Sequence, residues 1–201
     1  PVNIPQRKGD PIVIDTDEHP RASTTLEGLA KLKPVVTAEG TVTAGNASGI
    51  NDGAAAVLIA SEAAIEQYQL KPRAKIIAST AVGVEPRIMG FAPAPAIKKL
   101  LKQANLTLEQ MDVIELNEAF AVQALACIKL GNFPIEKINP SGGATAFGHP
   151  YGATGAILVT RLLTELNRNE SNRCGIVTMC VGGGQGAAIL IRKAGPIDGE
   201  Q

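Results

Sequence analysis

The feature that most constrains the fold is the regular alternation of strand-like and helix-like segments that follows Lys71-Pro72. Runs of aliphatic and β-branched residues alternate with segments whose apolar residues recur at helical spacing. The expected strands are 74–80, 112–116, 137–139, 174–180 and 187–192, and the expected helices are a segment starting near Pro95, 118–130 and about 153–167. Such alternation builds a mostly parallel sheet with right-handed crossovers and helices on both faces. We therefore predict an α/β fold of order β-α-β-α-β-α-β-β, with a mixed, mostly parallel five-stranded sheet whose last strand is antiparallel.

The residues before Lys71 are less regular, and we expect them to belong to other parts of the fold. Residues 1–49 are rich in Pro, Asp, Thr and Gly, which favours loops, with one short helix at 25–33. The apolar run 53–61 predicts a buried strand, and a helix is expected at 62–69. A Gly-Ala-Ala tripeptide precedes both this strand and the last one, which indicates the end of a second, similar domain. The expected divisions are 1–50, 51–72 and 73–201.

Composition and charge exclude several classes of function. Hydrophobic residues make up 45% and charged residues 19% of the 201-residue chain, and the formal net charge is zero. Scattered basic residues argue against a nucleic-acid surface, and no apolar run reaches membrane-spanning length. The two histidines and three cysteines lack the paired spacing of metal ligands. Three cysteines without a secretory signal fit a reducing compartment, so we expect a cytoplasmic protein.

The strongest candidate for chemistry is the run 141–155, SGGATAFGHPYGATG, which holds His149 at the centre of a glycine-rich loop. Glycine is costly in backbone entropy, so a loop this rich in it indicates that the backbone must approach another group closely. Histidine is the side chain best suited to proton transfer near neutral pH. A purely structural histidine is the alternative, and the loop composition favours a functional one.

Two further polar side chains are expected at the same edge of the sheet. Asn117 follows the strand 112–116, where α/β proteins build their sites, although a helix N-cap is an equally good interpretation. Cys180 ends the strand 174–180 and enters a run of glycines, whereas Cys127 and Cys174 are expected to be small core residues. An amide, an imidazole and a thiol that converge there suggest acyl chemistry with an oxyanion to stabilise.

Four sequence blocks together resemble the thiolase family, and they occur in the family's order. The blocks are 45–53 (GNASGINDG), 117–121 (NEAFA), 142–150 (GGATAFGHP) and 180–186 (CVGGGQG). The resemblance implies a thiolase-like fold and acetyl-CoA acetyltransferase activity, the condensation of two acetyl-CoA to acetoacetyl-CoA and the reverse thiolysis. It covers only the C-terminal half of the family's chain: the end of a loop domain that covers CoA, the last strand and helix of the N-terminal domain, and the C-terminal domain.

The resemblance also implies roles for individual residues in catalysis. Cys180 is the expected acid/base that removes the α-proton of the second acetyl-CoA. His149, with a water held by Asn117, is expected to stabilise the enolate oxygen, and His149 also to activate the nucleophile. The backbone N–H of Gly182 is expected to contribute to a second oxyanion hole. An enolate beside a thioester needs donors at its oxygen and a base near its carbon, so this set is chemically coherent.

Substrate contacts are implied in the same way. Ser48 is expected to contact the pantetheine arm, Arg21 to lie near the adenine nucleotide, and Met89 to close the acyl pocket with Phe120 nearby. The implied substrates are acetyl-CoA, acetoacetyl-CoA and CoA, with no cofactor and no metal. Thiolases are commonly dimers or tetramers, so a homo-oligomer is expected.

The chain also departs from the family. It lacks the nucleophilic cysteine of the N-terminal domain, so we expect it to be inactive without the N-terminal half of the same protein. Thr145, Phe147 and Tyr151 stand in a loop that is usually aliphatic, which indicates a changed acyl pocket. Two alternatives stay open: a 3-ketoacyl-CoA thiolase for longer chains, and a non-catalytic CoA-binding subunit of a split thiolase.

Overall fold

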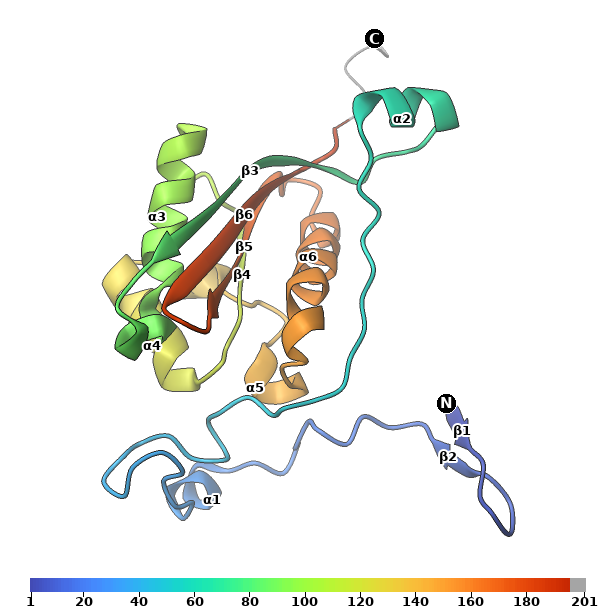
Figure 1. The fold of residues 1–201 in the computed structure, drawn as a ribbon, viewed down its shortest axis with the longest axis vertical. Helices are drawn as coiled ribbons and strands as arrows, with labels where there is room; N and C mark the ends of the chain where they lie inside the picture. Colours follow the sequence, from blue (N-terminus) through green and yellow to red (C-terminus); the bar gives the residue numbers. More distant parts are fainter. Residues whose placement is uncertain (196–201) are drawn as a thin grey trace.

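The computed structural model describes residues 1–195, and a four-stranded sheet lies at the centre of its second half (Figure 1). The strands of this sheet are β3 (Ala74–Gly83), β4 (Val113–Leu116), β5 (Cys174–Val181) and β6 (Gln185–Lys193). The helices around it are α3 (Pro93–Ala104), α4 (Ala121–Gly131), α5 (Ala144–Phe147) and α6 (Tyr151–Arg168), with short 3₁₀ helices η1 (Pro86–Phe91) and η2 (Ile135–Lys137). No helix within the described residues is both long and apolar enough to cross a membrane.

The strand order across the sheet is β3-β6-β5-β4. β4 and β5 are parallel, whereas β6 runs antiparallel to both of its neighbours, β3 and β5. β6 follows β5 through a tight turn in which Gly183 and Gly184 adopt φ values of +88° and +86°, a region that favours glycine. The predicted α/β class and mixed sheet are confirmed. The expectation of mostly parallel pairing is wrong, because the antiparallel strand β6 lies inside the sheet rather than at its edge, so β4–β5 is the parallel pairing and both pairings of β6 are antiparallel.

The predicted fifth strand at 137–139 is wrong, because only one residue of it pairs with the sheet. Ile138 makes an isolated parallel bridge to Ile114, directly after η2. The main-chain N–H of the next residue, Asn139, still donates to the Ile114 carbonyl at 3.0 Å, but its φ of +45° turns the backbone away and its side-chain amide continues the pairing. Its Oδ1 accepts from the Leu116 N–H at 2.8 Å and its Nδ2 donates to the Leu116 carbonyl at 2.9 Å. The edge of β4 is thus closed by a side chain instead of a strand.

Each face of the sheet has its own helix layer, as Figure 1 shows. Along β4, Val113 faces α6 and Ile114 faces α3 and α4, because successive residues of a strand point to opposite faces. The α6 layer is formed by Leu158, Leu162 and Leu166, which recur at helical spacing. The helix pattern that predicted α6 at about 153–167 and a helix near Pro95 is confirmed by α6 and α3.

The helix predicted at 118–130 begins three residues late, at Ala121. Asn117 continues the pairing of β4, since its main-chain N–H donates to the Thr178 carbonyl at 3.0 Å. Phe120 then stays extended and makes an antiparallel bridge to Ala47. Phe120 is therefore the N-cap residue of α4, and the N-cap interpretation of Asn117 is wrong.

The first 73 residues contain β1 (Val2–Ile4), β2 (Ile12–Ile14), α1 (Leu26–Ala30) and α2 (Glu62–Tyr68), joined by long extended segments (Figure 1). Both predicted short helices form, with Thr25 and Ser61 as side-chain N-caps. The buried strand predicted at 53–61 is wrong: these residues form no strand, and Leu58 and Ile59 are 84% and 73% exposed. An apolar run becomes a strand only beside another strand, and none of the described residues supplies one.

The expected divisions at 1–50, 51–72 and 73–201 stay a prediction. The end of the last one, residues 196–201, lies outside the described part of the chain. What the fold does establish is that the segment around residues 46–53 returns to the α/β part, where it contacts the start of α4 and the loop before α6.

Candidate active site

A cavity of about 520 Å³ lies where β5 ends, next to the first turns of α4 and α6. Its walls come from the segment around Ser48, from η1, from the start of α4, and from the turn between β5 and β6. The lining residues are Ser48, Ile50, Met89, Ala119, Phe120, His149, Tyr151, Gly152, Met179, Cys180, Val181 and Gly182. The carboxyl end of a parallel strand is where α/β folds place their ligands, and this cavity follows that rule.

Both ring nitrogens of His149 have polar neighbours. Nε2 lies 3.3 Å from Nδ2 of Asn117, and Nδ1 lies 2.7 Å from Oγ1 of Thr154. The main-chain N–H of His149 donates to the Gly49 carbonyl at 2.9 Å, which holds the residue from outside the α/β part. His149 thus has a fixed ring orientation at the cavity wall, with Asn117, itself only 1% exposed, behind it.

The protonation of this pair follows from its surroundings. Partial burial lowers the pKa of His149 below that of an ordinary histidine, so the imidazole is neutral at neutral pH. The amide Nδ2 of Asn117 can only donate, so in this arrangement Nε2 accepts and the ring proton lies on Nδ1, facing Thr154. A neutral imidazole whose Nε2 lone pair is held only by this amide contact can exchange it for an attacking thiol, accept the thiol proton, and then donate from the same nitrogen.

Cys180 contributes a protonated thiol to the same cavity. It is the penultimate residue of β5 and is 6% exposed. Burial raises its pKa above that of a free thiol, so the proton stays on sulfur at neutral pH. Two residues further on, Gly182 also lines the cavity. A buried thiol beside a neutral imidazole can serve as a general acid toward a carbanion.

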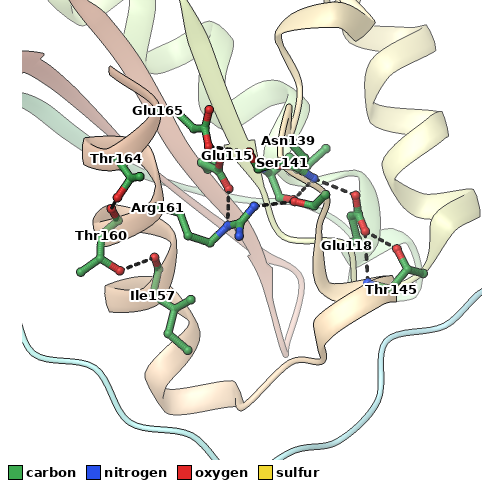
Figure 2. Close-up of polar contacts among 12 residues, drawn as sticks. Glu115, Glu118, Asn139, Ser141, Thr145, Ile157, Thr160, Arg161, Thr164 and Glu165 are labelled. Carbon is green, nitrogen blue, oxygen red and sulfur yellow. Dashed lines mark hydrogen bonds and ion pairs between the residues drawn. The ribbon is translucent and has the colours of Figure 1, made fainter. Parts of the chain in front are cut away.

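The loop that carries His149 is held from one side by Glu118, the residue after Asn117 (Figure 2). One carboxylate oxygen of Glu118 accepts from Asn139 Nδ2 at 2.8 Å. The other accepts from the main-chain N–H of Thr145 at 3.1 Å and from its hydroxyl. A side chain at position 143 would collide with this carboxylate, so Gly143 is required for the approach. The hydroxyl of Thr145 is thereby used for anchoring.

Arg161 of α6 holds the same loop from the other side (Figure 2). Its Nε donates to Glu115 Oε2 at 3.0 Å, its Nη2 donates to the Gly142 carbonyl at 2.6 Å, and its guanidinium carbon lies 4.4 Å from the ring centroid of Phe147. Glu115 is fully buried, and burial raises its pKa while Arg161 opposes that rise. A hollow of about 170 Å³ borders this network, but its arginines already pair with Glu115 and Glu165.

Comparison with known families places these features in one of them. The thiolase C-terminal domain matches residues 70–193, and the thiolase N-terminal domain matches residues 1–63. The chain belongs to the thiolase family. The resemblance drawn from the four sequence blocks is therefore confirmed.

Two groups of curated thiolases are similar to this chain. A β-ketoadipyl-CoA thiolase of Acinetobacter baylyi is 71% identical over 195 residues, and one of Pseudomonas aeruginosa is 55% identical over the same length. An acetyl-CoA acetyltransferase of Allochromatium vinosum is 48% identical over 193 residues. In each case 96% of this chain is matched, against 48% or 49% of the relative. The chain thus spans about half the length of these thiolases.

Solved thiolase structures have the same fold. The acetyl-CoA acetyltransferase of Bacillus anthracis superposes with a TM-score of 0.89 at 45% identity, over 96% of this chain and 49% of that one. Human mitochondrial 3-ketoacyl-CoA thiolase in complex with CoA superposes with a TM-score of 0.83 at 45% identity, over 90% of this chain and 46% of that one. The thiolase-like fold is therefore confirmed over nearly the whole of the chain.

The residues expected from the thiolase resemblance mostly come together. The expected residues that line the cavity are Ser48, Met89, Phe120, His149, Cys180 and Gly182, and Asn117 lies behind His149. The Ser48 hydroxyl donates to the Ala119 carbonyl at 3.1 Å. Arg21 is exposed in the segment between β2 and α1 and is not part of the lining. The roles of these residues in a thiolase reaction remain proposals.

Sequence reasoning missed the residues that support the site. Thr154 and Glu118 hold His149 and its loop. A threonine in a helix carries no distinctive signal, whereas Glu118 stands in the block 117–121, which was the signal that could have found it. The expectation that Thr145, Phe147 and Tyr151 all change the acyl pocket holds for one of them only. Thr145 and Phe147 are engaged by Glu118 and Arg161, and only Tyr151 belongs to the lining.

Proposed function

We propose that the protein to which this chain belongs is an acyltransferase. It cleaves 3-ketoacyl-CoA with CoA, and it also catalyses the opposite reaction, a Claisen condensation. The observation that supports this most directly is the shared cavity of Cys180, His149 and Gly182, with Asn117 behind the imidazole. A thiol that can exchange a proton with carbon, beside donors for an oxyanion, suits an enolate intermediate. Membership of the thiolase family supports the same chemistry.

In thiolysis the nucleophile is a cysteine outside this chain, which enters the reaction as a thiolate. Its sulfur bonds to C3 of the 3-ketoacyl-CoA, the C2–C3 bond breaks, and the electron pair of that bond moves to C2 as the enolate of acetyl-CoA. The Sγ–H of Cys180 gives its proton to C2 and acetyl-CoA leaves. CoA then loses its thiol proton to the Cys180 thiolate, its sulfur takes over the acyl group, and the nucleophilic thiolate is released. Condensation is the reverse sequence.

The states of the side chains in this structure support these roles. The raised pKa of Cys180 keeps a proton available for C2. His149 is neutral and can take the proton of the nucleophilic cysteine at Nε2, then donate from Nε2 to the enolate oxygen. We assign the backbone N–H of Gly182 to the oxyanion formed at the acyl-enzyme.

The substrates are coenzyme A thioesters, and no further cofactor is needed for these steps. Ser48 is assigned to the pantetheine arm because it lines the cavity on a segment that also contacts the start of α4. Arg21, which lies outside the lining, is assigned to the adenine nucleotide on the family resemblance. The partner is the N-terminal half of the same protein, which supplies the nucleophile, and the assembly is a homo-oligomer.

Two acyl groups are candidates for the part of the substrate beyond C3. Met89 and Phe120 in the cavity wall favour the small acetyl group of acetoacetyl-CoA. The β-ketoadipyl-CoA thiolases, at 71% and 55% identity, favour a longer acyl group, the succinyl group that C3 to C6 of β-ketoadipyl-CoA form, which ends in a carboxylate. Methionine is flexible enough to admit the longer chain, so we favour β-ketoadipyl-CoA. The ratio of kcat/KM for the two thioesters, measured on the full-length protein, decides between them.

The role of Cys180 is tested with Cys180→Ser in the full-length protein. A serine hydroxyl is a far weaker acid than a thiol, so condensation and thiolysis should slow at least about a hundredfold. Acylation of the nucleophilic cysteine by acetyl-CoA should fall much less, because in that step Cys180 protonates only the departing CoA thiolate, which is a far better leaving group than a carbanion. Single-turnover acylation is followed by intact mass, and condensation by the formation of the 3-ketoacyl thioester. An equal fall in both rates would remove Cys180 from the proton-transfer role.

A further inference from the structure

We propose that Tyr151 is a specificity-determining residue whose hydroxyl hydrogen bonds a terminal carboxylate on the acyl chain of a 3-ketoacyl-CoA. The inference rests on the proposed function, because it concerns the acyl end of the same cavity. Of the three unusual loop residues, Thr145 and Phe147 are anchored by Glu118 and Arg161. Tyr151 has no such anchor among the described contacts, and the inference starts from it.

Tyr151 stands next to the reacting groups. It is the first residue of α6 and follows His149 by two positions. The two rings meet edge to face, with centroids 4.8 Å apart and an interplanar angle of 83°. Tyr151 lines the cavity together with Met89 and Phe120, the residues assigned to the acyl group. A substrate whose C3 lies near His149 therefore extends its acyl chain along a wall that contains a phenol.

The other polar side chains of the lining already have partners or roles. The Ser48 hydroxyl donates to the Ala119 carbonyl, and the ring nitrogens of His149 face Asn117 and Thr154. Cys180 is assigned to proton transfer. The remaining side chains of the lining are apolar. The Tyr151 hydroxyl is thus the donor in this wall that is left for a polar acyl group.

The chemistry of the lining favours an anionic chain end over a neutral one. A carboxylate that leaves water needs hydrogen-bond donors, and a phenol O–H donates a charge-assisted bond to it. No aspartate or glutamate belongs to the described lining, so a carboxylate meets no like charge there. Tyr151 is 59% exposed in this chain, so a chain end that reaches its hydroxyl keeps part of its hydration.

The test compares Tyr151→Phe with the wild type in the full-length protein, with β-ketoadipyl-CoA and acetoacetyl-CoA as the two thioesters. The substitution removes the hydroxyl and keeps the ring against His149. Loss of a hydrogen bond to a charged group costs roughly a factor of ten to a hundred. The ratio of kcat/KM, β-ketoadipyl-CoA over acetoacetyl-CoA, should therefore fall at least about tenfold. Tyr68→Phe, in the distant helix α2, is the matched control and should keep the wild-type ratio.

A second variant separates the hydroxyl from the ring. Tyr151→Leu keeps an apolar wall without hydroxyl or ring, and its ratio should fall as far as that of Tyr151→Phe. An unchanged ratio in Tyr151→Phe overturns the proposal, and so does a wild type that cleaves acetoacetyl-CoA but not β-ketoadipyl-CoA. A wild type that cleaves neither thioester contradicts the thiolase function itself. The two failures are therefore distinguishable.

Discussion

The imidazole of His149 is neutral because the folded chain buries it, and this links its chemistry to the stability of the fold. The unfolded chain exposes the ring, whose pKa is then about 6.5. The folded chain has the lower pKa, so the unfolded state binds more protons once the pH falls below about 6.5. Acid therefore favours unfolding through this residue. What the buried neutral imidazole contributes to the free energy of unfolding is fully present only above the pKa of the unfolded chain.

We predict a pH dependence of stability that is traceable to His149. Between pH 7 and pH 5 the free energy of unfolding of the full-length protein should fall further in the wild type than in His149→Asn. Asparagine keeps a polar group at the cavity wall but does not titrate. Urea unfolding at several pH values gives both curves. Parallel curves for the two proteins would show that burial of His149 has no such effect.

The same reasoning gives the sign for activity. Because the pKa of His149 is lowered, the acidic limb of kcat/KM should lie below pH 6.5, where an ordinary histidine would already be half protonated. The raised pKa of Cys180 keeps the thiol protonated. The basic limb of kcat/KM should therefore lie at a higher pH than the one at which a free thiol titrates.

At the level of elements, the sequence pattern predicted what local periodicity determines. α3 and α6 form where apolar residues recur at helical spacing, and β5 forms from its run of apolar residues. The wrong expectations concern pairing. Residues 53–61 have the composition of a strand but no partner among the described residues, and residue 139 closes the sheet edge with a side chain. Pairing partners far away in sequence leave no local trace.

The candidate site follows the same division. His149, Cys180 and Asn117 could be predicted because each ends an element at one edge of the sheet, in recognisable blocks. Thr154 could not, since a threonine inside a helix is usually only a polar or packing residue. Arg161 lies 46 residues from Glu115 in the sequence, on the helix that covers the sheet face to which Glu115 points, so only the fold brings them together.

The buried pair of Arg161 and Glu115 gives a prediction at this scale. Arg161→Met leaves the fully buried Glu115 carboxylate without its counter-charge and removes the bond to Gly142. The free energy of unfolding should fall by about 3–5 kcal/mol. In the double variant Glu115→Leu/Arg161→Met no charge stays buried, so much of the loss should be recovered. Urea unfolding of the full-length variants measures both.

Arg87→Met is the control for that experiment. Arg87 and Glu85 also form an ion pair, with N and O 3.6 Å apart, but both side chains are largely exposed. Water screens such a pair, so its loss should change the free energy of unfolding by no more than about 0.5 kcal/mol. Comparable losses in Arg87→Met and Arg161→Met would mean that burial is not what makes the inner pair important.

For the whole molecule, the reactivity of its cysteines is the decisive property. Cys127, Cys174 and Cys180 are all buried, and burial raises the pKa of Cys127 and of Cys180. Little thiolate is available to attack a thioester. The 201-residue chain, mixed with radiolabelled acetyl-CoA, should therefore carry no covalent label after denaturation.

The full-length protein is the comparison, and one labelled cysteine per chain is expected there. Mass spectrometry of digested samples locates any acyl group. A stable thioester on one of the three cysteines of the isolated chain would mean that this half carries a nucleophile of its own. It would also favour a self-sufficient enzyme over a half that needs its partner.

The position of β6 has a consequence for how the molecule is made. This strand is the last element of the described chain, yet it lies between β3 and β5 in the sheet. A ribosome releases β3 before β6, so β3 waits without its neighbour until the residues between the two strands and β6 itself have been made. The sheet cannot close progressively from the N-terminus. Removing β6 would take away the middle of the sheet rather than its margin and leave β3 without a neighbouring strand, so the sheet depends on this late strand more than on β3 or β4 at its edges.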